Sequence, residues 1–248
     1  YPVFAHLPFV MGQDNAKLSK RNGEVSIAWY RDKGFLPEAI CNYLALLGWS
    51  PGDDRENVTM KELTELFTVE KVHSSPARFD MKKLEAINGD KIRALTIDEF
   101  LDWSLPFLTK AGVVSGSADE IALVKLALPL IQERIIMLSE VPAMLKFLFV
   151  KNFAVEADSV AKITDDASKQ VLERSLKELE PLATWTHESI EAALRSSLIE
   201  EMGLKPRIAF GAVRIATTGS TISPPLFESM ELLGKEASLA RIRAGLEL

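Results

Sequence analysis

Three cationic side chains lie within five residues near the start of this sequence. The stretch KLSKR begins at Lys17 and ends at Arg21, with Ser19 and Lys20 inside it and Gly23 shortly after. A lysine ammonium is a compact charge on a flexible stem, so two lysines three positions apart can follow a phosphate that moves. The hydroxyl and the loop amides would complete a cradle for a small polyanion. A solvated basic loop is the commoner explanation of five such residues taken alone.

Most other signatures of chemistry are missing from the sequence. It contains no G-x-G-x-x-G or Walker-type phosphate loop, no G-x-S-x-G elbow and no H-E-x-x-H pair. The histidines His6, His73 and His187 stand alone, without the spacing of metal ligands. Cys41 is the only cysteine, which excludes a disulfide framework within the chain and any multi-cysteine metal site. We therefore expect no metal site and a reducing, cytoplasmic location.

Composition is that of a globular protein. The chain has 248 residues, of which 47% are hydrophobic and 26% charged, enough for a sizeable core in one to three domains. The most apolar stretches, 122–131 and 144–150, are interrupted by lysine and proline and are shorter than the ~20 residues that cross a bilayer. The first ten residues do not resemble a signal peptide, and the chain looks like a piece of a longer protein.

Helix signals dominate after a short extended entry. Pro37 begins an apolar-periodic stretch that Gly48 ends. A proline at 129 should kink or split a helix over 119–138, and Ser139 should cap the next one. Capping-box spacing marks three helix starts, at Thr59 with Glu62, Thr96 with Glu99, and Ser117 with Glu120.

Five further helices follow in the second half of the chain. Strand-like alternation is scarce after residue 30 and no stretch repeats at a fixed period, so we expect a mainly α fold. The expected helices cover about 165–180, 187–202, 206–217, 224–233 and 235–246.

Charge is distributed unevenly along a chain whose formal net charge is -6. Residues 156–201 contain eleven acids against five lysines and arginines, whereas 203–227 contain Lys205, Arg207 and Arg214 and no acid. An acid-free basic stretch in an acidic protein is a candidate face for a polyanion such as RNA. A solvated basic face remains the alternative from charge alone.

Four blocks of the sequence occur in an order that is typical of one family, HLPFVMGQDNAKLSKRNG at 6–23, GFLPEAICNYLALLGWSPGD at 34–53, SSPARFDMKKLEAINGDKIR at 74–93 and KPRIAFGAVRIATTGSTISPPLFESMELLG at 205–234. On these blocks the sequence resembles the bacterial glutamyl-tRNA synthetase family, which belongs to class I. Arg21 replaces the serine that ends the usual "KMSKS" loop, and the aromatic residues that many relatives place around Asn88 are absent.

The resemblance implies an ATP-dependent enzyme that activates glutamate and attaches it to the 3′ end of a tRNA, with Mg²⁺ accompanying ATP. The upstream half of that enzyme has no counterpart here, so we expect the chain alone to be inactive in aminoacylation. By resemblance, Lys20 is catalytic and contacts the ATP phosphates, with Lys17 and Ser19 beside it. Catalysis of displacement at the α-phosphate of ATP consists mostly of positioning and charge neutralisation, which lysines on a loop can supply.

The resemblance also places anticodon recognition in the last block. It implies that four residues read the anticodon, namely Arg214, Ser223, Pro224 and Leu226. An arginine fork, a hydroxyl and apolar platforms are the groups by which proteins usually recognise unstacked RNA bases. Arg134 is a weaker candidate. The implied partner is the glutamate tRNA, with the glutamine tRNA left open, and a monomer without membrane association is expected.

We divide the chain accordingly, and two other classes of function stay open. The alternatives are a helical RNA-binding module without catalysis, which would not need KLSKR, and a helical interaction protein. Glutaminyl-tRNA synthetase, the nearest enzyme alternative, has a β-barrel anticodon domain that the helical pattern disfavours. The expected parts are the end of a class I catalytic domain (1–24), a stem-contact region (25–95) and two helical anticodon-binding subdomains (96–155 and 156–248).

Overall fold

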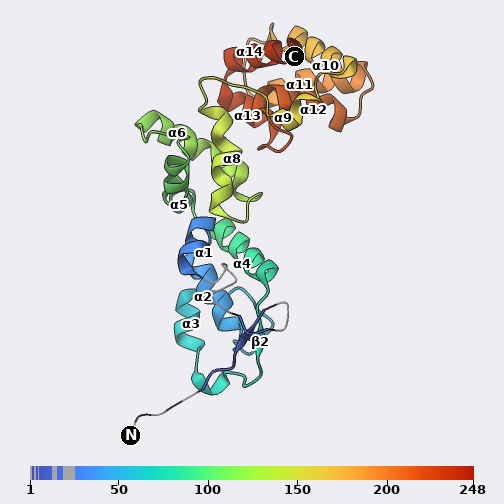
Figure 1. Cartoon of the computed structure of the whole chain (residues 1–248). Helices are drawn as coiled ribbons and strands as arrows, with labels where there is room; N and C mark the ends of the chain where they lie inside the picture. The colour runs from blue at the N-terminus through green and yellow to red at the C-terminus, as the bar shows by residue number, and fades with distance from the viewer. Residues whose placement is uncertain (1, 3, 5, 13–15, 19–25) are drawn as a thin grey trace. The chain divides into compact units, whose positions relative to one another are not determined.

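The computed structural model describes residues 2, 4, 6–12, 16–18 and 26–248. The chain forms two compact units, each built from two segments (Figure 1). Unit 1 comprises residues 1–107 and 132–141, and unit 2 comprises 108–131 and 142–248. The fold is mainly α, as the sequence predicts, and the two strands among the described residues are two residues long each. Our four-part division stays a prediction.

Unit 1 packs short helices around an aromatic and aliphatic core. The closest packing is between α2 and α4, and the buried side chains of Tyr43 and Leu84 belong to these two helices. Its elements are β1 (Val10–Met11), α1 (Ile27–Lys33), α2 (Pro37–Leu46), α3 (Met60–Leu66), the 3-10 turn η2 (Val69–Lys71), β2 (Ala77–Arg78), α4 (Met81–Ala94), most of α5 (Ile97–Lys110) and the 3-10 turn η3 (Leu138–Glu140).

Buried amides hold the segments of unit 1 together. Asn88 on α4 accepts a hydrogen bond from the Leu36 amide at 2.8 Å and donates to the Ile136 carbonyl at 2.5 Å. Gln132 donates to the Ile92 carbonyl at 2.9 Å. Backbone groups in loops must find partners when they are buried. These side chains supply such partners, and they tie 132–141 to α4 and to the turn between α1 and α2.

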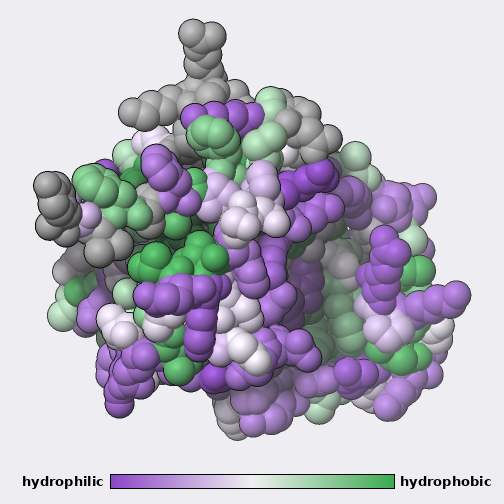
Figure 2. Space-filling model, turned by 90° about the horizontal axis from the view of Figure 1, so that it is seen from below, coloured by the Kyte–Doolittle hydropathy of each residue, from purple (hydrophilic) through white to green (hydrophobic). Residues whose placement is uncertain are grey.

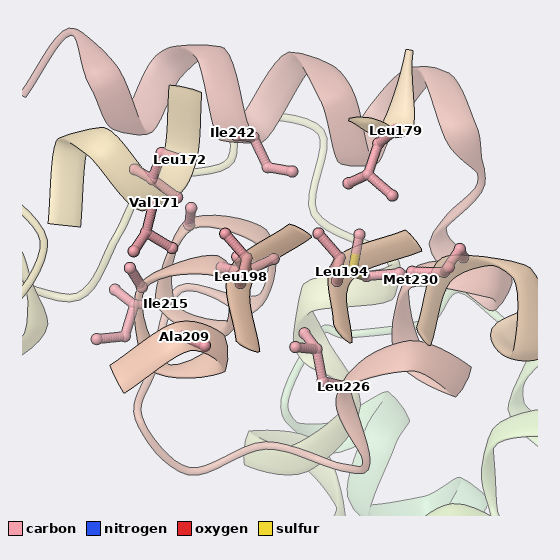
Figure 3. Close-up of a cluster of buried hydrophobic side chains, with 14 of the residues drawn as sticks. Val171, Leu172, Leu179, Leu194, Leu198, Ala209, Ile215, Leu226, Met230 and Ile242 are labelled. Atoms are coloured by element: carbon pink, nitrogen blue, oxygen red, sulfur yellow. The ribbon is translucent and has the colours of Figure 1, made fainter. Parts of the chain in front are cut away.

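Unit 2 is a helical cluster with its own core. Side chains from α10, α11, α12, α13 and α14 meet in it, and Leu172, Leu194, Leu198 and Met230 are fully buried (Figure 3). The elements are α6 (Ala118–Ala127), most of α7 (Pro129–Gln132), most of α8 (Val141–Leu145), the 3-10 turn η4 (Lys146–Leu148), α9 (Ala157–Val160), α10 (Asp166–Leu179), α11 (His187–Leu194), the π-helical segment η5 (Arg195–Glu201), α12 (Pro206–Thr218), α13 (Leu226–Leu233) and α14 (Lys235–Leu246).

The local helix signals are largely confirmed. In all three predicted capping boxes the glutamate accepts from the backbone of the cap residue, at 2.8 to 3.1 Å. Pro129 splits the helix as predicted, with α6 before it and α7 beginning at it. The cap expected at Ser139 is wrong, because Ser139 lies inside η3 and the Glu140 carboxylate accepts from the Met137 amide instead.

One face of the described surface is mainly polar (Figure 2). Figure 2 shows hydrophilic side chains over most of the face in view, with smaller hydrophobic groups between them. Among the described residues no helix is both long and apolar enough to cross a membrane.

Candidate nucleic-acid interface

The predicted phosphate loop is described only in part. Ser19, Lys20 and Arg21 lie outside the described residues. Lys17 forms an antiparallel bridge with Met11, and its ammonium lies 4.0 Å from the centroid of the Phe9 ring. β1 in turn pairs in parallel with β2, so Met11 is in register with Arg78. Lys17 is therefore an exposed cation attached to a small β structure, and the contacts predicted for it and its neighbours stay predictions.

Arg214 lies on α12 and is turned toward the segment that follows this helix. Its Nη1 donates to the Ser223 hydroxyl at 2.5 Å and to the Pro224 carbonyl at 2.7 Å. The Thr218 hydroxyl donates to the Arg214 carbonyl at 2.8 Å. The structure thus brings together three of the predicted anticodon residues. In this conformation the Arg214 fork organises the segment 219–225, and that segment carries the serine and the proline.

The predicted apolar platforms are less accessible than the resemblance implies. Leu226 is 3% exposed and belongs to the same buried cluster of unit 2 as Leu194 (Figure 3). Pro224 is also buried, and Ser223 is 6% exposed. A buried side chain cannot stack on a base without a rearrangement of the segment. We therefore assign Leu226 to the core, and its contact with a base stays a prediction.

Cations flank α12 at its start. Lys205 precedes the helix, Arg207 lies in its first turn, and both are exposed. Arg195 on η5 lies 5.7 Å from the centroid of the Phe210 ring of α12. The first turn of α12 contains no acid, so Lys205 and Arg207 add to the positive end of the helix dipole, whereas Arg195 is paired with Glu191 at 2.6 Å. This arrangement favours an anionic partner over a cationic one.

Arg134 belongs to unit 1 rather than to the helices that carry Arg214. It is exposed in the turn between Gln132 and Ile136, whose hydrogen bonds to α4 hold that turn. Side-chain amides of unit 1 hold the segment of Arg134, and the predicted subdomain that includes it, 96–155, stays a prediction. Its role in binding the anticodon stays a prediction.

An ionic contact supports the helix that follows the segment 219–225. The Nδ1 of His187 at the start of α11 lies 2.7 Å from the Glu231 carboxylate of α13. This hydrogen bond, aided by the charges of Glu188, Glu231 and Glu228, raises the pKa of His187. Protonated His187 therefore stabilises the contact between α11 and α13 more strongly than neutral His187 does.

Comparison with protein families decides what this helical region is. The family model described as "Anticodon binding domain" matches residues 69–246. The chain belongs to this family. A second model, described as "tRNA synthetases class I (E and Q), catalytic domain", matches residues 1–86, which contain the KLSKR stretch. The two models follow each other along this family member in the order that the sequence predicts.

Individual relatives agree with the two models. The chain is 50% identical to a glutamate–tRNA ligase of Saccharopolyspora erythraea over 99% of its own length and 49% of that protein. It is 49% identical to one of Nocardioides sp., over 99% of this chain and 51% of the relative. The chain thus spans about half the length of the curated relatives it matches.

Solved structures give the same result. A glutamate tRNA ligase from Elizabethkingia meningosepticum, in complex with its amino acid, matches with a TM-score of 0.81 at 26% identity. The glutamate-tRNA synthetase of Elizabethkingia anophelis matches with a TM-score of 0.79 at 26% identity. Each match covers the whole of this chain and 52% of the other.

Sequence reasoning missed the side chains that hold these predicted sites in place. Asn88 is a landmark of the resemblance, yet its bonds to Leu36 and Ile136 span 52 and 48 residues. Asn42 is similar, since its side chain accepts from the Val58 amide at 2.8 Å and donates to the Glu56 carbonyl. A polar residue at a buried position of an apolar helix face is the signal that could have identified Asn42.

Proposed function

We propose that this chain is the tRNA-binding portion of an ATP-dependent glutamate–tRNA ligase of the cytoplasm. The observation that carries the proposal is the order of the two family models, a class I catalytic domain over 1–86 and an anticodon-binding domain over 69–246. About half of the residues are shared with glutamate–tRNA ligases over nearly the whole chain. A helical RNA-binding module without catalysis would have no use for the first of these domains.

Within that enzyme the KLSKR stretch would act on ATP. Displacement at the α-phosphate of ATP by the glutamate carboxylate leaves pyrophosphate, whose developing charge needs neutralisation. We assign Lys20 to that charge, with Lys17 and Ser19 beside it. Among the described residues no group of three or more His, Cys, Asp or Glu side chains could hold a metal ion.

The anticodon side of the proposal rests on α12 and the segment 219–225. Arg214 combines a guanidinium fork with a hydroxyl at 2.5 Å, on a stretch of chain that contains no acid. Such groups suit the hydrogen-bonding edges of unstacked bases. The exposed Arg207 suits a phosphate contact. We expect the glutamate tRNA as the partner and a monomeric protein.

Binding of tRNA by this 248-residue chain tests the proposal. The ligands are glutamate tRNA and a copy with a changed anticodon, each at two salt concentrations. Arg214→Ala should cost about 1 to 3 kcal/mol against the matching anticodon and little against the changed one. Arg207→Ala should weaken both tRNAs equally and reduce the salt dependence. Lys177→Ala, which removes an exposed cation of α10, is the matched control.

Two outcomes would contradict parts of this proposal. Equal weakening of both tRNAs by Arg214→Ala would make Arg214 a phosphate contact. If the unsubstituted chain bound glutamate tRNA no better than an unrelated RNA of the same length, the proposed function itself would fail.

A further inference from the structure

Arg241 on α14 is a buried cation whose partners among the described residues are two carbonyls and an aromatic ring. It is 9% exposed. Its Nη1 donates to the Thr217 carbonyl at 2.7 Å, and its Nη2 donates to the Phe147 carbonyl at 2.8 Å. The guanidinium carbon lies 3.9 Å from the centroid of the Phe153 ring. Within the described residues, no acidic side chain pairs with it.

Such an arrangement needs a compensating reason. Burial of a charge is unfavourable unless hydrogen bonds and nearby dipoles offset it. Here desolvation lowers the pKa of Arg241 to about 10. The Thr217 carbonyl belongs to the last turn of α12, where the negative end of the helix dipole favours a cation. An aromatic face at close range stabilises a desolvated guanidinium further. Arg241 is thus held in one orientation by contacts in three directions.

The same contacts reach the segment 219–225. Gly219 ends α12 with a φ of +86°, and a Cβ there would lie 3.3 Å from the Phe153 ring and 3.2 Å from the Ala154 carbonyl. The Glu156 amide donates to the Gly219 carbonyl at 2.9 Å. Hydrogen bonds from Lys146 and Ser220 lower the pKa of Glu156. Residues 153–156 therefore hold the backbone at Gly219, where the chain leaves α12. Arg241 packs on the ring of Phe153 in this segment.

The other end of the segment is held by Arg214, through Ser223 and Pro224. We propose that Arg241 and Phe153 are positioning residues that fix the segment 219–225 and thereby set how strongly the anticodon is discriminated. This inference rests on the proposed function. Neither side chain needs to touch RNA for this role. Because positioning acts on the geometry of reading rather than on charge, it should change discrimination between anticodons and leave the salt dependence of binding unchanged.

The test measures the ratio of the dissociation constants for changed-anticodon and glutamate tRNA. Arg241→Lys keeps the charge but cannot donate to both carbonyls while lying flat on the ring. We expect it to lower the ratio about tenfold, with affinity for the changed tRNA within twofold of wild type and the same salt slope. Arg243→Lys is the matched control, since Arg243 is an exposed cation on α14 that pairs with Glu180.

A second variant covers the case in which Arg241→Lys does not fold. Phe153→Leu keeps a hydrophobic side chain and removes the aromatic face, and it should lower the same ratio. Amide hydrogen exchange in 219–225 should accelerate in both variants, while exchange in the core helix α10 stays unchanged. An unchanged ratio in a folded variant, or equal weakening of both tRNAs, would overturn the inference.

The exchange measurement separates this inference from the proposed function. If the wild-type chain binds glutamate tRNA no better than an unrelated RNA, the proposed function fails; if it binds the two tRNAs equally, only anticodon reading by 219–225 fails. Acceleration confined to 219–225 would then still identify Arg241 as a positioning residue for this segment, and unaltered exchange would refute that as well.

Discussion

A methyl group added at Gly34 should disrupt unit 1 far more than the same change at another glycine with a similar backbone. Gly34 has a φ of +87°, and a Cβ there would lie 2.5 Å from the Leu138 amide nitrogen and 2.6 Å from that of Ser139. Gly52 has a φ of +99°, with nothing within 4 Å of the same position. Both alanines incur the left-handed backbone penalty of about 1 to 2 kcal/mol. Only Gly34→Ala also collides with backbone.

The extra cost can be worked from the contacts that the collision breaks. Residues 138–139 must retreat, which removes the hydrogen bond from the Leu138 amide to the Gly34 carbonyl at 3.1 Å. It also strains the bond from Asn88 to Ile136, in the same segment. Each bond is worth about 0.5 to 1.5 kcal/mol, and a buried group left unpaired costs about 1 to 3. We expect Gly34→Ala to destabilise unit 1 by about 2 to 3 kcal/mol more than Gly52→Ala.

Urea unfolding followed by tryptophan fluorescence measures this difference. Three of the four tryptophans, Trp29, Trp49 and Trp103, belong to unit 1. A Trp185→Phe background therefore restricts the signal to that unit. Equal loss of stability in the two alanine variants would refute the reasoning, because it would show that residues 138–139 do not lie against Gly34.

Two further predictions concern charged groups of unit 2. The pKa of His187 is higher in the folded than in the unfolded protein, where it is about 6.5. Its contribution to stability is therefore fully present below pH 6.5 and is lost as the pH rises through the pKa of the folded state. The wild type should therefore exceed His187→Gln in melting temperature by more at pH 5.5 than at pH 8.5, and a constant difference would contradict this. Glu120 has a pKa of about 2, chiefly through hydrogen bonds from Ser115 and Ser117, so its contribution is present above pH 4.5 and is lost toward pH 2. Glu120→Gln should lower the melting temperature at pH 7 and not at pH 2, whereas the exposed Glu173→Gln control should change it at neither.

The sequence by itself determined the local architecture of this protein. Each capping box joins groups three residues apart, so the bond from Thr59 to Glu62 depends on almost nothing outside its own turn. Pro129 likewise acts within its own turn, because its missing amide and its ring separate α6 from α7. Pro106, in contrast, lies inside α5 without ending it. The amphipathic pattern also indicated a mainly α chain, because helical periodicity and turn residues are properties of short segments. The synthetase type came from the resemblance of four sequence blocks to that family.

Only the tertiary structure decided how the predicted site residues are used. Arg241 reaches the Phe147 carbonyl across 94 residues, and Asn88 reaches Leu36 across 52. Contacts of such separation depend on how helices pack, and the hydrophobic periodicity of one segment does not specify which distant segment it meets. For this reason the sequence could name Leu226 as a candidate platform, while the packing of α13 placed that side chain in the core. Packing likewise assigned Arg134 to unit 1, through hydrogen bonds of the Asn88 and Gln132 side chains that no local sequence pattern predicts.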